Sequence, residues 1–249
     1  MKKLNYLFLS IILLFSMFSM SLTAKALSVE ETDYNTLLNE GILDESITHE
    51  MWEQSKLESE EALKNRENDL LEEDVENEEV NSLLAKSGYK MKKGDIFISN
   101  RTSSKGLTGH SAIAVSDEKI LHIRGYNHTT QLLTLKQWKD DYGKKDSKTW
   151  TKVYRIKNTD DATKAGTWAY RNYYNPNGGA SHTIKPKYGL GGGNMVKDPT
   201  YCSKIVWQAY RTGLGRGDVI KPPFSGLIMP YSLPDYFTSS YTPKLVANF

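Results

Sequence analysis

The strongest hydrophobic pattern in the chain lies between residues 198 and 213, in the stretch DPTYCSKIVWQAYRTG. Five side chains recur there at i, i+3, i+4, i+7 and i+8, the spacing of one buried stripe on a helix: Cys202, Ile205, Val206, Ala209 and Tyr210. Asp198 can cap such a helix, Pro199 suits its first turn, and Gly213 suits its end. The pattern predicts a helix that carries the only cysteine of the chain in its first turn.

Alternation of apolar and polar residues predicts strands upstream of this helix. A strand is expected within residues 91–100, and a β-hairpin within 110–127, where Ser-Asp-Glu-Lys interrupts the alternation. Four more elements are expected: a helix at 132–142, a strand at 151–158, a helix at 160–175 capped by Asp160 or Asp161, and a turn with a short helix at 229–240. The glycine-rich loop at 177–194 should border the site. Together these elements predict an α+β domain whose small antiparallel sheet packs on the cysteine helix.

The first 26 residues have the pattern of a secretory signal peptide. Lys2 and Lys3 precede an apolar run, and Ala24-Lys25-Ala26 forms a small-x-small cleavage site. We therefore expect a mature protein that begins at Leu27 and is secreted or held in the bacterial cell envelope. An uncleaved anchor is the alternative. No later apolar run is long enough to span a bilayer.

The formal charge of +2 hides two oppositely charged parts. Residues 27–85 carry 19 Asp and Glu against 3 Lys and Arg, a balance of −16, whereas residues 86–249 carry +15. The chain thus divides into a signal peptide at 1–26, an acidic arm at 27–85 and a basic domain at 86–249. Short helices are expected in the arm near 37–43 and, mostly solvated, at 51–71. The arm is either a soluble, partly disordered segment or a pro-segment that contacts the basic domain through its opposite charge.

Two histidines, His110 and His122, stand 12 residues apart in the predicted hairpin. With an odd-length loop centred near Ser116, they face each other across neighbouring strands and share one face of the sheet. Only the small residues Ala112 and Ala114 lie beside His110 on that face. We expect the helix with the cysteine to pack over this face.

The position of Cys202 bears on its chemistry. A single cysteine in an exported chain cannot form an internal disulfide, so it is either a small buried hydrophobe or a functional thiol. The first turn of a helix favours a thiolate, because free N–H groups and the positive end of the helix dipole meet there. Such sites lower a cysteine pKa from about 8.5 to roughly 3.5–7.5. The helix start thus predicts a nucleophile at neutral pH.

Five short motifs in order, KKGDIFIS, GHSAIAV, ILHI, YCSKIVWQAY and PYSLPDYFTSS, give the segment 91–240 a family resemblance. They resemble the YiiX-like and YycO-like proteins, which belong to the circularly permuted branch of the NlpC-type, papain-like cysteine hydrolases together with lecithin-retinol acyltransferase. The resemblance implies a permuted papain-like fold with Cys202 as nucleophile, His110 as general base and acid, and His122 as the third residue. Other candidates for the third position are Arg124, Asn127 and His128. The backbone N–H of Cys202, with Tyr201 nearby, would serve the oxyanion hole.

This resemblance implies an exported cysteine hydrolase that forms an acyl-enzyme on Cys202 without a cofactor or metal. Its expected substrate is a peptide amide of the cell wall, and a lipid ester is the alternative within the same fold. Two other classes stay open: a non-catalytic surface-binding module, and a zinc site formed by His110, His122 and one of His128, His182 or Cys202. Nucleic-acid binding is not expected, because no recognised motif accompanies the basic charge.

Overall fold

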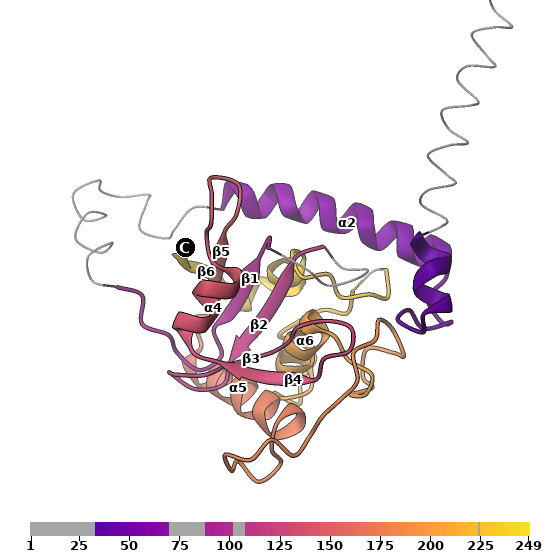
Figure 1. Cartoon of the computed structure of the whole chain (residues 1–249). Helices are drawn as coiled ribbons and strands as arrows, with labels where there is room; N and C mark the ends of the chain where they lie inside the picture. The colour runs from indigo at the N-terminus through magenta and orange to yellow at the C-terminus, as the bar shows by residue number, and fades with distance from the viewer. Residues whose placement is uncertain (1–32, 70–87, 102–107, 224) are drawn as a thin grey trace, which may run out of the picture.

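The computed structural model describes residues 33–69, 88–101, 108–223 and 225–249 (Figure 1). The predicted signal peptide and the acidic run at 71–80 lie outside the described residues. One six-stranded antiparallel sheet has the order β4-β3-β2-β1-β5-β6. Its strands are β1 (Ile96–Ser99), β2 (His110–Ala114), β3 (Ile120–Ile123), β4 (Thr130–Leu133), β5 (Thr151–Arg155) and β6 (Lys244–Asn248). The predicted α+β class is confirmed. No helix in the described ranges is long and apolar enough to cross a bilayer.

The hairpin of β2 and β3 forms as the alternation predicts, but its register differs from the expected one. Ile113 pairs with Leu121, and the Val115 N–H donates to the Lys119 carbonyl at 2.8 Å. The turn is therefore centred on Asp117 and not on Ser116. An even separation still keeps both histidines on one face, although they are diagonal and not directly opposite.

The sheet is covered on both faces, and the two covers differ in composition. One face, which carries Ile113 and Leu121, packs against α5 (Thr159–Tyr173) and α6 (Cys202–Arg211) in the larger core. The other face, which carries Phe97 and Ala112, packs against α4 (Leu135–Tyr142) in a smaller core that contains Trp138. Helices α4 and α6 lie on opposite sides of β2 (Figure 1).

Helix α6 carries the predicted stripe, but it begins later than predicted. Its first residue is Cys202 and its N-cap is Tyr201, which makes no side-chain capping bond. Asp198 does not cap the helix, because its carboxylate accepts from the Lys187 N–H at 2.9 Å. All nine residues from Cys202 to Tyr210 are buried, since other parts of the chain also cover the side of the helix away from the sheet.

Several other boundaries differ from the sequence prediction. Residues 130–133 extend the sheet as β4, and α4 begins only at Leu135, after a capping box of Thr134 and Gln137. Asn158, and not Asp160 or Asp161, caps α5. Strand β6 has no counterpart in the prediction. The expected short helix near the C-terminus is the 3-10 helix η1 (Leu233–Tyr236), and η2 (Ser239–Tyr241) follows it.

The acidic arm forms a short helix at 33–39 and the long helix α2 (His49–Asn68), which runs across the top of the domain in Figure 1. As expected, most residues of α2 are not buried, but one face of the helix packs on the domain. One stripe of the helix is buried: Trp52, Ser55, Ser59, Ala62 and Arg66. The guanidinium of Arg66 pairs with Asp235 at 2.8 Å, so a cation of the acidic arm contributes to this contact.

A buried carboxylate joins the start of β1 to β5. Asp95 is fully buried and receives both Nε and Nη2 of Arg155, at 2.6 and 2.7 Å. The hydroxyl of Tyr89 and the N–H of Lys92 also donate to it, at 2.5 and 2.8 Å. These donors satisfy the hydrogen-bonding capacity of the Asp95 carboxyl group despite its burial.

Asp95→Ala is therefore expected to destabilise the fold by about 3 kcal/mol, because it leaves the Arg155 guanidinium without its buried partner. Urea unfolding followed by circular dichroism measures the change. Asp140→Ala, which removes the exposed partner of Lys136, is the matched control and should leave the unfolding midpoint unchanged. Equal midpoints for both variants would show that the Asp95 network contributes nothing.

Candidate active site

His110 and His122 form a buried imidazole pair. Nε2 of His110 lies 2.9 Å from Nδ1 of His122. The two residues are only 1% and 2% exposed. Strands β2 and β3 bring the rings together because both point to the same face of the sheet.

Helix α4 covers this pair with aromatic rings. The imidazole of His110 stacks on Tyr142 at 4.6 Å and on Trp138 at 5.6 Å between ring centroids. Ala112 and Ala114 occupy the same face, and their small side chains leave the space that these rings fill. The sequence analysis missed Trp138 and Tyr142, although their i, i+4 spacing in a charged segment is a signal for one packed face.

Cys202 approaches β2 from the other side, so the expectation that its helix covers the histidine face is wrong. Helix α6 packs on the face of Ile113 and Leu121. The thiol lies beside Ser111, the residue that follows His110 in β2. Among the described residues, no hydrogen bond joins Sγ of Cys202 to an imidazole.

Two residues, Ser111 and Tyr142, nevertheless connect the thiol to the imidazole of His110. Ser111 is bonded covalently to His110 and interacts with the thiol. Tyr142 stacks on His110, and Cys202 is one of the groups that raise the pKa of the Tyr142 hydroxyl, although burial raises it most. The thiol is therefore within electrostatic range of the ring that covers His110.

Burial determines the protonation of all three groups. It raises the pKa of Cys202, and the Ser111 N–H and the polar groups of Ser203 offset this only in part. The expectation of a thiolate at the helix start is thus wrong for this closed structure. Burial also lowers the pKa of His110 well below its usual value and that of His122 to about 3. At neutral pH the site holds a thiol and two neutral imidazoles.

The outer nitrogens of the pair have no partner among the described residues. These are Nδ1 of His110 and Nε2 of His122. A neutral imidazole carries one N–H, so two arrangements of the bridging proton exist. When Nε2 of His110 donates to His122, Nδ1 of His110 is left as a buried acceptor. That arrangement is the one a general base needs.

The other candidates for the third position make no described hydrogen bond to the imidazole of His110, although Arg124 contacts the hydroxyl of Tyr142. Arg124 is exposed and pairs with Asp141 at 3.5 Å. Asn127 occupies a positive-φ turn position, at 63°, and His128 is exposed. Within the described part of the chain, His122 is the side chain that hydrogen bonds to the imidazole of His110.

The two residues predicted to serve the oxyanion hole, Cys202 and Tyr201, lie at the start of α6. Cys202 is the first residue of the helix, so its N–H has no partner within the helix. The hydroxyl of Tyr201 accepts from the Ile228 N–H at 3.0 Å, and its side chain is fully buried. Tyr201 therefore ties the helix start to the loop at Ile228.

The zinc alternative needs a third ligand beside His110 and His122. In the described ranges, no three His, Cys, Asp or Glu side chains lie close enough to hold a metal ion. His182 stacks on Tyr174 at 4.5 Å and contacts the hydroxyl of Thr130 at 3.2 Å.

His122→Asn is expected to reduce the loss of stability on acidification. The pKa of His122 is about 3 in the folded chain, whereas an unfolded histidine titrates near 6.5. The unfolded state therefore takes up the proton first, and the free energy of unfolding falls as the pH drops below about 6.5. Between pH 7 and pH 5 this group alone accounts for about 2 kcal/mol. Urea unfolding at both pH values measures it, and an equal loss in the variant would contradict a buried neutral imidazole.

Comparison with known proteins places the chain in a family. The model of the family described as "Lipoprotein N-acylation protein LnsA-like" matches residues 68–249. An uncharacterized 30.3 kDa protein of Bacillus thuringiensis is 42% identical over 162 residues, which cover 65% of this chain and 59% of that protein. The chain thus spans about three fifths of the length of this relative. No solved structure matches. Because the family model covers most of the chain, from the end of α2 to the C-terminus, the protein belongs to the LnsA-like family of lipoprotein N-acylation proteins.

Proposed function

We propose that this protein is an acyl-modifying enzyme of the cell envelope, with Cys202 as nucleophile, His110 as base and His122 as the residue that orients His110. The observation that carries the proposal is the buried imidazole pair, joined at 2.9 Å, with Nδ1 of His110 unpartnered among the described residues. Ser111, which follows His110 in β2, lies beside the thiol, and Tyr142, which stacks on the ring, is within electrostatic range of the thiol. The permuted papain-like fold is part of the same proposal.

In the proposed reaction the thiol first gives its proton to Nδ1 of His110, and this step requires a rearrangement of the closed site, in which no described hydrogen bond joins the two groups. The sulfur attacks the carbonyl carbon of an acyl donor and forms a tetrahedral intermediate, in which the N–H of Cys202 can donate to the oxyanion. His110 then returns the proton to the leaving alcohol or amine, and a thioester remains on Cys202. An amine or water then attacks the thioester and gives a proton to His110, the C–S bond breaks as the new amide or acid forms, and His110 returns the proton to the departing thiolate.

The protonation of the closed site fits a resting state of this cycle. A thiol and two neutral imidazoles hold no unpaired charge in the buried site. Hydration of the site would remove the burial that raises the pKa of Cys202. The proton transfer is therefore coupled to opening of the site.

The family favours an ester donor over the wall peptide expected from the sequence. Its description names N-acylation of lipoproteins, which is the formation of an amide on an amine. Transfer from a lipid ester through a thioester accomplishes this without another energy source, because an amide is more stable than an ester or a thioester. Cleavage of a wall-peptide amide uses the same three residues and is the second candidate.

Trapping the acyl-enzyme tests the reaction. Incubation with a phospholipid should add the mass of one fatty acyl chain to the wild-type protein and nothing to Cys202→Ala. His110→Ala should slow formation of the adduct by about 10²–10⁴-fold, which is the usual contribution of a general base. Intact-mass spectrometry at fixed times measures both. An adduct in Cys202→Ala, or none on the wild type with either a phospholipid or a wall peptide, would refute the proposal.

The orienting role of His122 has its own test. His122→Ala should slow formation of the adduct, and His122→Asn should recover part of the rate, because its side-chain oxygen can accept from Nε2 of His110. His182→Ala, which removes a histidine outside the pair, is the matched control and should react like the wild type. Equal rates in His122→Ala and His122→Asn would show that the hydrogen bond does not act in the reaction.

Helix α2 is part of the proposal because it is tied to both loops that flank the site. The hydroxyl of Ser59 lies 2.8 Å from that of Thr108, two residues before His110. Glu58 accepts from the Ser225 hydroxyl at 3.0 Å. The same loop continues to Ile228, whose carbonyl accepts from Ser203 next to the nucleophile. Helix α2 thus acts as a cover that must shift before a substrate reaches Cys202, which is 1% exposed.

Alkylation of Cys202 by iodoacetamide measures this cover without any substrate. Ser59→Glu places a carboxylate in the buried contact and should accelerate alkylation at least tenfold. Leu57→Glu adds the same charge at a position that is 62% exposed and should leave the rate unchanged. Arg66→Ala, which releases Asp235, provides a second opening variant. If Cys202 is alkylated at the wild-type rate in both opening variants, helix α2 does not cover the site. The acyl-transfer proposal would be unaffected by that result.

A further inference from the structure

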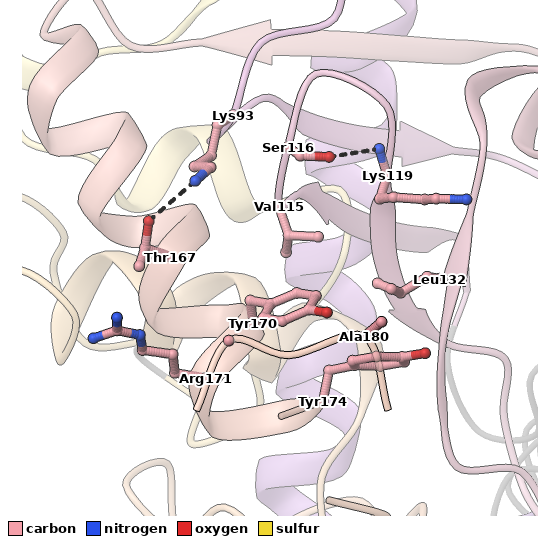
Figure 2. Close-up of a pocket in the computed structure, with 11 residues that line it drawn as sticks. Lys93, Val115, Ser116, Lys119, Leu132, Thr167, Tyr170, Arg171, Tyr174 and Ala180 are labelled. Carbon is pink, nitrogen blue, oxygen red and sulfur yellow. Dashed lines mark hydrogen bonds between the residues drawn. The ribbon is translucent and has the colours of Figure 1, made fainter. Parts of the chain in front are cut away.

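A separate pocket lies at the far end of β2 (Figure 2). Its volume is about 610 Å³, and it is formed by the β2–β3 turn, the second half of α5 and the loop at 178–180. His110 begins β2, whereas Val115 lines the pocket just after the strand ends. Five residues of strand separate them by about 16 Å. The pocket therefore shares no residue with the candidate active site.

Helix α5 presents a polar and aromatic stripe to this pocket. Thr167, Tyr170, Arg171 and Tyr174 follow at i, i+3, i+4 and i+7, and all four line it. This stripe is distinct from the buried one, which includes Ala165 and Ala169 and packs in the core. Its aromatic and cationic side chains are available to a ligand.

The charged groups of the pocket have one sign. Three cations line it, Lys93, Lys119 and Arg171, and no carboxylate does. Among the described residues, none of the three forms an ion pair. The two acids of the turn, Asp117 and Glu118, line the adjoining shallow pocket instead, where Asp117 accepts from the Lys93 N–H at 3.3 Å. The lining therefore favours an anion.

Lys93 is held in place across α5. Gly166 leaves the space for its stem, since a Cβ there would meet Cγ of Lys93 at 2.6 Å. Its ammonium lies 3.4 Å from the hydroxyl of Thr167 (Figure 2). The Lys93 side chain therefore runs along the wall of the pocket and ends beside Thr167.

The remaining wall suits an organic group. Leu132, Val115 and Ala180 are apolar, and Tyr170 packs on Tyr174 at 5.1 Å between ring centroids. His182 stacks on Tyr174 at 4.5 Å, so a sugar, glycerol or acyl portion would contact Tyr170 and the edge of Tyr174. A volume of about 610 Å³ lies in the range of small-molecule sites and exceeds the needs of a bare phosphate ion.

We infer that this pocket binds a phosphate ester, with the phosphate between Lys93 and Arg171 and the organic portion against Tyr170 and Tyr174. Lysine and arginine both donate charge-assisted hydrogen bonds to phosphate oxygens. The ester can belong to a soluble molecule or to the headgroup of a lipid. The inference does not depend on the reaction proposed for Cys202.

Calorimetric titration of the mature protein tests the inference with glycerol 3-phosphate and with inorganic phosphate as probes. Glycerol 3-phosphate should bind more tightly, because it also contacts the tyrosines. Arg171→Ala and Lys93→Met should each weaken its binding about tenfold. Lys145→Met removes the same charge from an exposed loop position and is the matched control, with unchanged binding expected.

Vesicles of phosphatidylglycerol in phosphatidylcholine distinguish the two sources in a sedimentation assay. Loss of vesicle binding in Arg171→Ala but not in Lys145→Met would assign the site to a lipid headgroup. Binding of glycerol 3-phosphate alone, with the same dependence on Arg171, would assign it to a soluble ester. Equal weakening in all three variants, or no binding of any probe, would overturn the inference, since only the general basic charge would then act.

Discussion

Strand β2 is buried on both of its faces, and this burial sets the positions of the helices around it. All five of its residues are buried. A strand in this position needs a partner layer on each side, and α6 and α4 provide them. His110 therefore enters the aromatic layer under α4, while Ser111 turns toward the start of α6 and the thiol. One peptide unit of β2 thus connects the two halves of the candidate site.

This burial has an electrostatic consequence. Low dielectric surroundings disfavour charge, so the thiol and both imidazoles are neutral in the closed structure. The positive end of the α6 dipole does not overcome this cost. Reactivity at such a site depends on access of water and substrate, and we propose that helix α2 controls both. The family match begins at residue 68, the last residue of α2, so almost the whole of this helix lies outside the matched segment.

The two ends of strand β2 border different functional groups. The start of β2 carries the histidine and approaches the thiol, whereas the turn after β2 borders a cationic pocket. Helix α5 has two different faces. Ala165 and Ala169 pack in the core, whereas Tyr170 and Arg171 line that pocket. A packed strand with chemistry at each end allows one domain to hold two separate sites.

Local periodicity and composition account for the features of this protein that could be predicted before its structure was known. The stripe from Cys202 to Tyr210 is buried as its spacing requires, and the hairpin forms at the predicted residues. His110 and His122 share a face because their separation is even, so the pair survives a register that differs from the predicted one. Which layer covers which face depends on tertiary packing, which places α4 on His110 and α6 on the opposite face of the sheet. Periodicity shows that a face is buried but not what covers it, because the partner is chosen by contacts between residues far apart in the chain. The same long-range packing raised the pKa of Cys202, which the helix start alone predicts to be low.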